Sequence, residues 1–448
     1  MKPIAVLTAV SDAVWEADLV AATADDVLGV TVVRRCVDLA DLLAVAATGQ
    51  ARAVVLSADL RRLDREALSR LAQHQVAVVA LAQPGDSAAQ QRLAQLGIAH
   101  VLPADASAER VAATLAEAVH LVVAGTAHPV VAGTAPEVAW SGQSARAGAI
   151  GPGQSERSTS ESTAEVAGAR GQVIAVWGPQ GAPGRTTVAV ALASELAGLG
   201  SETLLVDADV YGGVIAQLLG LLDESPGLAA ACRLAGMGGL DQAALVDLAR
   251  AVAPKLRVLT GITRPDRWLE LRPSSLEVVL ERARATAAFT VVDGGFCLER
   301  DEELSFDTSA PRRNGATLAL VQSADVVVVV GSADPTGLQR LIRGLSDLQE
   351  AAPGVSPVVV VNRLRSSAIP GDCGAEVRVA LARYAGTERV HLVPMDVTGV
   401  DAAVSTGQSL REAAPTSPAR TALVSLAAEL AGMAAPTMGR RRWSLRRN

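Results

Sequence analysis

The segment GPQGAPGRTT at residues 178–187 brings together residue types that hold phosphate groups. It follows an apolar run at 173–177 and precedes apolar residues at helical spacing, so we expect a strand, a glycine loop and a helix. Main-chain amides of the loop and the positive end of the helix dipole would then converge on phosphate oxygens. The expected contacts are Gly181, Ala182, Pro183, Gly184, Arg185, Thr186 and Thr187, with Thr186 also on Mg²⁺.

The loop departs from the strict phosphate-loop pattern GxxxxGK[ST] at two positions. Pro179 replaces the first glycine and Arg185 replaces the lysine. Arginine keeps the positive charge, but its broad planar fork need not fit between two phosphates as a compact ammonium group does. We therefore expect nucleotide binding with slow or absent hydrolysis. The alternative is a glycine turn that binds nothing.

Aspartates end two later apolar runs. Asp207 and Asp209 close the segment ETLLVDAD, and Asp293 closes AFTVVD ahead of two glycines. Carboxylates at the carboxyl ends of strands can orient water or Mg²⁺ near bound phosphates. A single aspartate in such a place is usually a helix cap or turn residue, but three in this order after one glycine loop favour a site.

Two further Val-rich runs, at 326–330 and 358–361, predict two more buried strands, the second followed by Asn362 and Arg363. The deviant loop, the two aspartates of DAD, the segment DGG at 293–295 and this Asn-Arg pair together resemble the MinD/ParA family of P-loop ATPases, over about residues 172–430. The resemblance implies ATP and Mg²⁺ as ligands and a homodimer as the assembled form.

The resemblance also assigns roles by position. It assigns catalysis to three charged side chains, Asp209, Asp207 and Arg185, and the α-phosphate to Thr187. It assigns Mg²⁺ to Thr186 and Asp293. The adenine end of the nucleotide falls to Asn362, Arg363 and Pro394. The signature lysine of the family falls on Gln180, so both lysines of the family's loop are replaced here, which puts hydrolysis in doubt.

Residues 1–125 alternate short Val/Leu/Ala runs with amphipathic stretches, the pattern of a parallel sheet covered by helices. The expected strands are 4–9, 30–34, 53–56, 76–81 and 99–102, and the last helix is 108–123. This topology resembles a response-regulator receiver domain with flavodoxin-like strand order. The places where a receiver carries its acidic pair, its phosphorylated aspartate and its lysine lack those residues. Asp59 falls about two positions late, so we interpret it as a helix-cap or loop residue.

Two segments outside these patterns are rich in polar residues. Residues 126–170 contain Gly, Ser, Ala, Pro, Glu and Thr without hydrophobic periodicity, so we expect a flexible linker. Residues 298–315 are strongly charged and form either a partner-facing flap or a solvated insertion. Arg312 and Arg313 in this segment are candidates for a phosphate contact.

The carboxy-terminal end is basic. A helix capped by Ser417 is expected over about 418–431, followed by a tail at 436–448 with five arginines in nine residues, interleaved by Trp443 and Leu445. We interpret this tail in three ways that remain open: contact with an anionic membrane surface, a solvated tail, or non-specific contact with DNA.

Composition limits the classes of protein. A chain of 448 residues exceeds one compact core, and a net charge of −7 argues against wrapping nucleic acid, so sequence-specific nucleic-acid binding is not expected. The apolar runs fall short of the ~18–20 residues that cross a bilayer, and no secretory signal is present, so a cytoplasmic protein is expected, with association at a pole or septum. The four cysteines lack metal or disulfide spacing and are expected to be reduced.

These features predict an α/β protein of two doubly wound parallel-sheet domains, a degenerate receiver-like domain at 1–125 and an ATPase-like domain at 171–435. Within the MinD/ParA family, the receiver-like front domain resembles the CpaE and TadZ subgroup, which helps place Flp pili and includes actinobacterial septum-site-determining proteins. The leading hypothesis is an ATP-dependent positioning switch acting on a pilus or secretion apparatus or on the division septum. The alternatives are an inactive nucleotide-binding scaffold, a DNA-segregating ATPase and a phosphorelay regulator.

Overall fold

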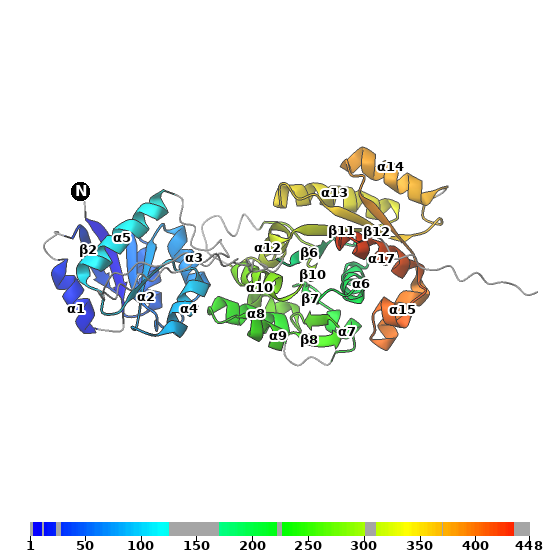
Figure 1. Cartoon of the computed structure of the whole chain (residues 1–448). Helices are drawn as coiled ribbons and strands as arrows, with labels where there is room; N and C mark the ends of the chain where they lie inside the picture. The colour runs from blue at the N-terminus through cyan, green and yellow to red at the C-terminus, as the bar shows by residue number, and fades with distance from the viewer. Residues whose placement is uncertain are drawn as a thin grey trace, which may run out of the picture.

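The computed structural model describes residues 3–10, 13–23, 28–124, 170–221, 226–300, 311–369 and 371–433, which form two α/β domains (Figure 1). The predicted linker at 126–170, apart from Arg170, and the predicted basic tail at 436–448 lie outside the described residues. So does most of the charged segment at 298–315, of which 301–310 are not described.

The first domain is built on a parallel sheet of five strands in the order β2-β1-β3-β4-β5. This is the flavodoxin-type doubly wound order. Each predicted strand is present, with ends that differ from the prediction by no more than one residue. The strands are β1 (Ile4–Ala9), β2 (Val30–Arg35), β3 (Ala53–Ser57), β4 (Ala77–Ala82) and β5 (His100–Pro103).

Helices cover both faces of this sheet, because successive strand side chains point to opposite sides. On β3, Val54 and Leu56 belong to one apolar layer, and Ala53 and Val55 belong to the other. Side chains of Asp38, Asp64, Asp86 and Ser107 accept hydrogen bonds from the first turns of α2 to α5 and so fix where these helices begin. The helices are α1 (Ala13–Ala22), α2 (Leu39–Ala46), α3 (Arg65–Gln73), α4 (Ser87–Leu96) and α5 (Ala108–Val123).

The second domain is built on a sheet of eight strands in the order β13-β12-β11-β6-β10-β7-β9-β8. Val-rich strands at its centre are buried on both faces, as expected for a parallel sheet between helices. The strands are β6 (Gln172–Trp177), β7 (Thr203–Ala208), β8 (Arg250–Ala253), β9 (Leu256–Leu259), β10 (Phe289–Gly294), β11 (Val326–Ser332), β12 (Val358–Leu364) and β13 (Val390–Pro394).

One edge of this sheet departs from the predicted parallel arrangement. Strand β8 pairs with β9 in antiparallel fashion, whereas the other pairs are parallel. Only Pro254 and Lys255 connect β8 to β9, and Lys255 adopts a left-handed φ of 63°. A parallel pair needs a crossover of a dozen residues or more, so this short connection forces a hairpin.

Helices pack on both faces of the second sheet in two apolar layers. Figure 1 shows α6 on one side of the sheet and α10, α12 and α13 among the elements that cover the other. The helices are α6 (Arg185–Gly198), α7 (Ile215–Leu218), α8 (Gly227–Gly236), α9 (Gln242–Leu248), the 3₁₀ helix η1 (Pro265–Glu270), α10 (Pro273–Thr286), α12 (Gly315–Ser323), α13 (Pro335–Ala351), α14 (Cys373–Ala385), α15 (Val397–Thr406), α16 (Leu410–Ala413) and α17 (Pro418–Leu430).

A buried charge cluster fixes the end of the second domain to α6. Glu195 on α6 is 3% exposed and accepts hydrogen bonds from Arg420 at 2.6 Å and from Arg411 at 2.9 Å. A buried carboxylate is tolerated when it is paired and hydrogen-bonded in this way. The two arginines therefore hold α16 and α17 against the helix that follows the glycine loop.

The two domains touch through α3 and α4 of the first and α8 and α10 of the second (Figure 1). Arg272 forms an ion pair with Glu66 at 3.3 Å. Arg92 donates hydrogen bonds to the carbonyl oxygens of Ala58 and of Met237, at 2.8 and 3.1 Å. Arg92 thus links the end of β3 directly to the second domain.

No helix in the described parts of the chain combines the length and the apolar character needed to span a bilayer. Among the same residues, the four cysteines form no disulfide. Burial raises the pKa of the Cys232 thiol to about 12, which keeps it unreactive.

Candidate nucleotide-binding site

The glycine loop joins β6 to α6 at the carboxyl end of the second sheet, as predicted from the sequence. Gly181 and Gly184 have left-handed φ values of 77° and 86°, which side chains with a Cβ rarely adopt. A Cβ at Gly178 would lie 2.3 Å from the carbonyl oxygen of Val330 on the neighbouring strand. The three glycines are therefore required by the path of the loop.

The first turn of α6 offers unpartnered amide groups to a ligand. Gly184 occupies the cap position, and no side chain accepts a hydrogen bond from the first amides of this helix of 14 residues. These amides lack partners within the helix itself and carry the positive end of its dipole. They begin at Arg185, where the sequence placed the phosphate contacts.

Arg185 folds inward across the loop. Its guanidinium donates to the carbonyl oxygen of Gly178 at 3.0 Å and to Asp209 Oδ2 at 3.3 Å. The guanidinium carbon also lies 5.9 Å from the ring centre of Phe296. The positive charge that replaces the usual lysine thus lies inside the site, shared between a carbonyl and a carboxylate.

Asp207, near the end of β7, and Asp209, directly after the strand, organise the loop that follows. Asp209 Oδ1 accepts the amide of Tyr211 at 2.9 Å, and Asp207 Oδ2 accepts the amide of Ile215 at 3.1 Å. Burial raises the pKa of Asp207 to about 7, hydrogen bonds from the Ile215 and Asp209 amides lower it, and the charge of Asp209 raises it. Asp207 therefore anchors the loop, while Asp209 presents a carboxylate to Arg185.

Asp293 ends β10 beside the loop and is 1% exposed. Neither of its carboxylate oxygens has a hydrogen-bond partner among the described residues. Burial raises its pKa well above the ordinary value and the charge of Asp207 adds to this, while the nearby Thr186 hydroxyl, which lies outside hydrogen-bond geometry, and the charge of Arg185 lower it. An unpartnered buried carboxylate is costly, and a bound cation would balance it.

The donor set suits Mg²⁺ in one specific way. The described residues contain no group of three or more His, Cys, Asp or Glu side chains able to hold a metal. Mg²⁺ commonly binds through one or two protein oxygens together with phosphate oxygens and water. Thr186 and Asp293 fit that pattern, so a metal here would arrive with a phosphate ligand.

Of the three residues predicted for the adenine end, Asn362 contacts the glycine loop, and no contact with the loop is seen for Arg363 or Pro394 in the described residues. Asn362 lies near the carboxyl end of β12 and donates from Nδ2 to the carbonyl oxygen of Pro183 at 3.1 Å, so it contacts the glycine loop itself. Arg363 is exposed and has a left-handed φ of 58°, and Pro394 ends the neighbouring strand β13. The structure brings Asn362 to the loop, and the sheet places Arg363 and Pro394 at the same edge.

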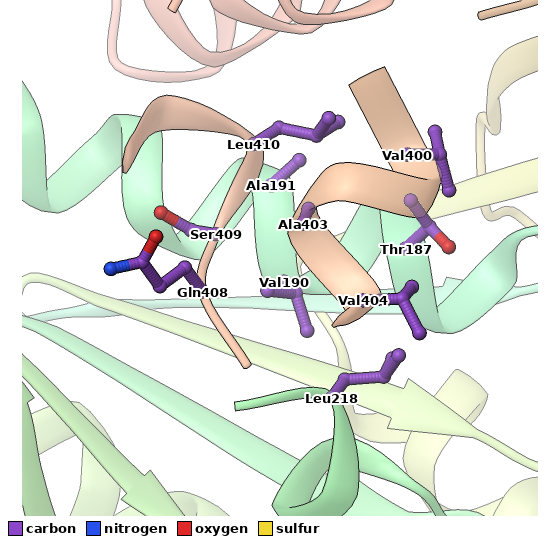
Figure 2. A pocket seen from close by; sticks show the side chains of 10 residues that line it. All are labelled: Thr187, Val190, Ala191, Leu218, Val400, Ala403, Val404, Gln408, Ser409 and Leu410. Atoms are coloured by element: carbon purple, nitrogen blue, oxygen red, sulfur yellow. The ribbon is translucent and has the colours of Figure 1, made fainter. Parts of the chain in front are cut away.

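Figure 2 shows Thr187 on the side of α6 that faces α15, beside Val400 and Val404. The small cavity between these elements measures about 20 Å³. That is room for about one water molecule, so this cavity is too small for a nucleotide.

An aromatic and polar cluster, which the sequence did not predict, closes the site opposite the loop. The rings of Tyr211 and Phe296 lie 4.6 Å apart, and Arg313 stacks over Tyr211 at 4.2 Å. The Tyr211 hydroxyl donates to Asn314 Oδ1 at 2.5 Å. The predicted contact of Arg313 with phosphate thus competes with this stacking. No spacing in the sequence signals the cluster, because its members come from three separate segments.

An open groove borders the loop on the side of α13. Its volume is about 670 Å³. The walls come from the start of the loop, from the segment after β10 and from α13; they include Pro179, Gln180, Phe296, Glu299, Arg340 and Arg343. Gln180, where the family's signature lysine would fall, thus faces an accessible space.

Comparison with known proteins identifies the segment that carries this site. Residues 170–234 match the ParA family model, described as an NUBPL iron-transfer P-loop NTPase. This match spans β6, the glycine loop, α6 and β7, so the second domain contains a ParA-type P-loop NTPase segment.

Two uncharacterized proteins of Mycobacterium tuberculosis are each 31% identical over 165 residues, which is 37% of this chain. The alignment spans 40% of the length of these curated relatives.

Solved structures with a similar fold include a ParA family ATPase from Chlorobium tepidum, 17% identical, covering 57% of this chain and 98% of that one, with a TM-score of 0.48. The cell division ATPase MinD from Pyrococcus furiosus is 20% identical, covering 58% and 99%, with a TM-score of 0.44. The septum site-determining protein MinD from Pyrococcus horikoshii, complexed with Mg-ADP, is 19% identical, covering 58% and 95%, with a TM-score of 0.44.

Proposed function

We propose that this chain, which contains a ParA-type P-loop NTPase segment, binds ATP with Mg²⁺ and acts as a positioning switch of the MinD/ParA type. The observation that carries the proposal is the buried, unpartnered carboxylate of Asp293 beside a glycine loop and an uncapped helix start. The amides attract an anion and the carboxylate attracts a cation. A Mg²⁺ nucleotide supplies both charges to one place.

In this proposal the loop 181–187 holds the phosphates, and Thr186 and Asp293 hold Mg²⁺, the latter through water. The metal would neutralise phosphate charge and orient the phosphates when bound. Asn362, Arg363 and Pro394 border the base. Asn362 contacts the carbonyl of Pro183, so it connects the base end of the site to the loop.

Hydrolysis is proposed to be slow or absent. Asp209 is the candidate for orienting water, yet its carboxylate is held by Arg185 at 3.3 Å. A phosphate must draw Arg185 away before Asp209 is free to act. With Gln180 in place of the signature lysine, the charge that stabilises phosphoryl transfer is also reduced.

The first domain is proposed to be the targeting module. Its flavodoxin-type strand order and lack of a receiver's acidic cluster support a degenerate receiver, as in CpaE and TadZ proteins. We propose that nucleotide binding closes a homodimer, which this domain recruits to a pilus or secretion assembly or to the septum. The basic tail at 436–448 would add contact with an anionic membrane.

A catalytically inactive scaffold is the second candidate, and the Arg185 and Asp209 ion pair favours it. A ParA-type ATPase that binds DNA non-specifically is less well supported, because the chain has a net charge of −7.

The test is ATP binding and turnover by the purified full chain. We expect wild type to bind ATP in the presence of Mg²⁺ and to lose affinity in EDTA, and Asp293→Asn to abolish the effect of Mg²⁺. Asp372→Asn is the matched control, because Asp372 caps α14 and asparagine also caps helices. No binding by wild type at millimolar ATP would overturn the proposal. Binding with turnover reduced by Arg185→Ala would favour a working ATPase over a scaffold.

A further inference from the structure

Arg340 on α13 lies directly against the glycine loop. A Cβ built at Gly181 would stand 2.2 Å from the Arg340 Nη1 atom and 3.3 Å from its Cζ atom. The guanidinium therefore occupies the space that any larger residue at position 181 would need. This contact joins α13 to the part of the loop next to Gln180.

Apart from Arg340, the arginines described beside the loop are already engaged by other groups. Both lysine positions are occupied by other residues, Gln180 and Arg185. The guanidinium of Arg185 is already engaged by Gly178 and Asp209, and that of Arg313 stacks over Tyr211. Phosphate groups carry several negative charges and are bound most strongly by charge-assisted hydrogen bonds.

Arg340 is exposed and forms no ion pair within the described part of the chain. The buried side chains of Leu341 and Leu348 hold α13 on the sheet and Asp334 caps its start, so the position of the helix does not depend on the exposed Arg340. Its side chain borders the groove of about 670 Å³. A guanidinium in this position is free to reorient toward a ligand on the loop.

We propose that Arg340 is a phosphate-binding residue that supplies, from α13, the cation missing at Gln180. The inference rests on the proposed function, because it needs a nucleotide on the loop. The proposal also gives a second reason for glycine at position 181, besides its left-handed φ. A side chain there would displace the Arg340 guanidinium. A planar fork on a separate helix reaches phosphate oxygens from outside the loop, where a lysine of the loop would reach them from within.

The experiment compares MgATP affinity of the full chain in wild type, Arg340→Ala and Arg340→Lys. We expect Arg340→Ala to weaken binding about tenfold, the value of one charge-assisted hydrogen bond, and Arg340→Lys to recover part of it. Arg383→Ala, at an exposed arginine of α14 that does not line this groove, is the matched control and should stay within about twofold. The Arg340→Ala loss should shrink as salt is raised, because it is electrostatic.

The outcomes separate the two proposals. If wild type binds MgATP and Arg340→Ala binds equally well, the role of Arg340 is overturned while the proposed function stands. If wild type does not bind, both fall. The assignment would also be overturned if the loss in Arg340→Ala did not change with salt, if Arg340→Lys recovered no affinity, or if Arg383→Ala weakened binding equally.

Discussion

Near the carboxyl end of the first sheet the buried acid Glu16 is paired, whereas Asp293, one of three buried acids at the carboxyl end of the second sheet, is not. Glu16 on α1 is 6% exposed, accepts a hydrogen bond from the Thr8 hydroxyl and forms an ion pair with Arg35. Asp293 is equally buried, but its oxygens have no partner in the described residues. Both domains are built on sheets with mainly parallel strands, and the carboxyl edges of the two sheets differ in what satisfies a buried charge.

This difference separates a structural acid from a candidate functional one. A buried carboxylate that its own chain satisfies needs no ligand. One that the chain leaves unsatisfied, beside glycines and free amides, is stabilised only when something binds. The first domain therefore has a flavodoxin-type sheet whose buried acid is satisfied by its own chain, and the second keeps a buried acid that a ligand would satisfy.

The largest loss of MgATP affinity should come from a side chain that obstructs the glycine loop at the carboxyl edge of the second sheet. Gly184→Val places a side chain where Asn362 Nδ2 would lie 2.3 Å away, at a φ of 86°. We expect MgATP affinity to fall by at least about 100-fold, because the amides of the loop can no longer converge. Isothermal titration calorimetry measures the loss.

Gly354→Val is the control for backbone strain. Gly354 has a similar φ of 90° and no atom within 4 Å of its Cβ position. If both variants bind MgATP alike, the loop is not the binding site and the contrast between the two edges loses its functional meaning.

The next effect tests the closed edge of the first domain. Glu16→Ala leaves Thr8 and Arg35 without their partner, and we expect the first domain to lose about 1–3 kcal/mol of unfolding free energy. Chemical denaturation provides the measurement. Asp18→Ala, at an exposed position of the same helix, should change stability by less than about 0.5 kcal/mol. Equal effects of the two variants would show that Glu16 is not an anchoring charge.

A smaller effect concerns pH. Because burial raises the pKa of Asp207 from 3.8 to about 7, the folded chain holds a proton there that the unfolded chain releases. Below pH 3.8 Asp207 is protonated in both states and does not lower the unfolding free energy. As pH rises from 3.8 to about 7, the unfolded state releases this proton more readily than the folded state, so the unfolding free energy falls. We expect wild type to lose unfolding free energy between pH 5 and 8 relative to Asp207→Asn, as followed by denaturant titration, while exposed Asp372→Asn tracks wild type. A parallel pH dependence of all three would contradict the raised pKa.

The smallest expected effect is none at all. Incubation of the first domain, within the full chain, with acetyl phosphate and Mg²⁺ should give no acid-labile phosphorylation detectable by mass spectrometry. Asp59→Asn should leave that result unchanged, because the edge lacks the acidic pair that holds Mg²⁺ in receivers. If wild type were phosphorylated and Asp59→Asn were not, Asp59 would be a phosphorylation site. The contrast between the carboxyl edges of the two sheets would then fail.

The sequence predicted the elements well where local patterns decide them. The five strands of the first domain end within one residue of the expected positions, because buried β runs and capping residues such as Asp64 are local signals. The order of strand, glycine loop and helix at β6 and α6 was predicted for the same reason. The hairpin of β8 and β9 was missed, since short half-exposed strands at an edge carry little hydrophobic pattern.

For the site, the sequence identified residue types and their places along the chain, but not their contacts. It placed Asp207, Asp209 and Asp293 at strand ends, and parallel strands bring such ends to one edge. It did not show that Arg185 pairs with Asp209 or that Arg313 stacks on Tyr211. Those contacts depend on side-chain rotamers and on loops from distant segments.

The amino-acid sequence by itself thus determined two α/β domains and a glycine loop without lysines between a strand and a helix, and it predicts a first domain without a phosphorylation site. Only the tertiary structure decided which acid is satisfied and which is not, and that Arg340 of α13 lies against Gly181. The physical reason is that backbone preferences and hydrophobic periodicity act over a few residues. Pairing of buried charges depends on which segments the crossovers of the sheet bring together, and no local pattern encodes that.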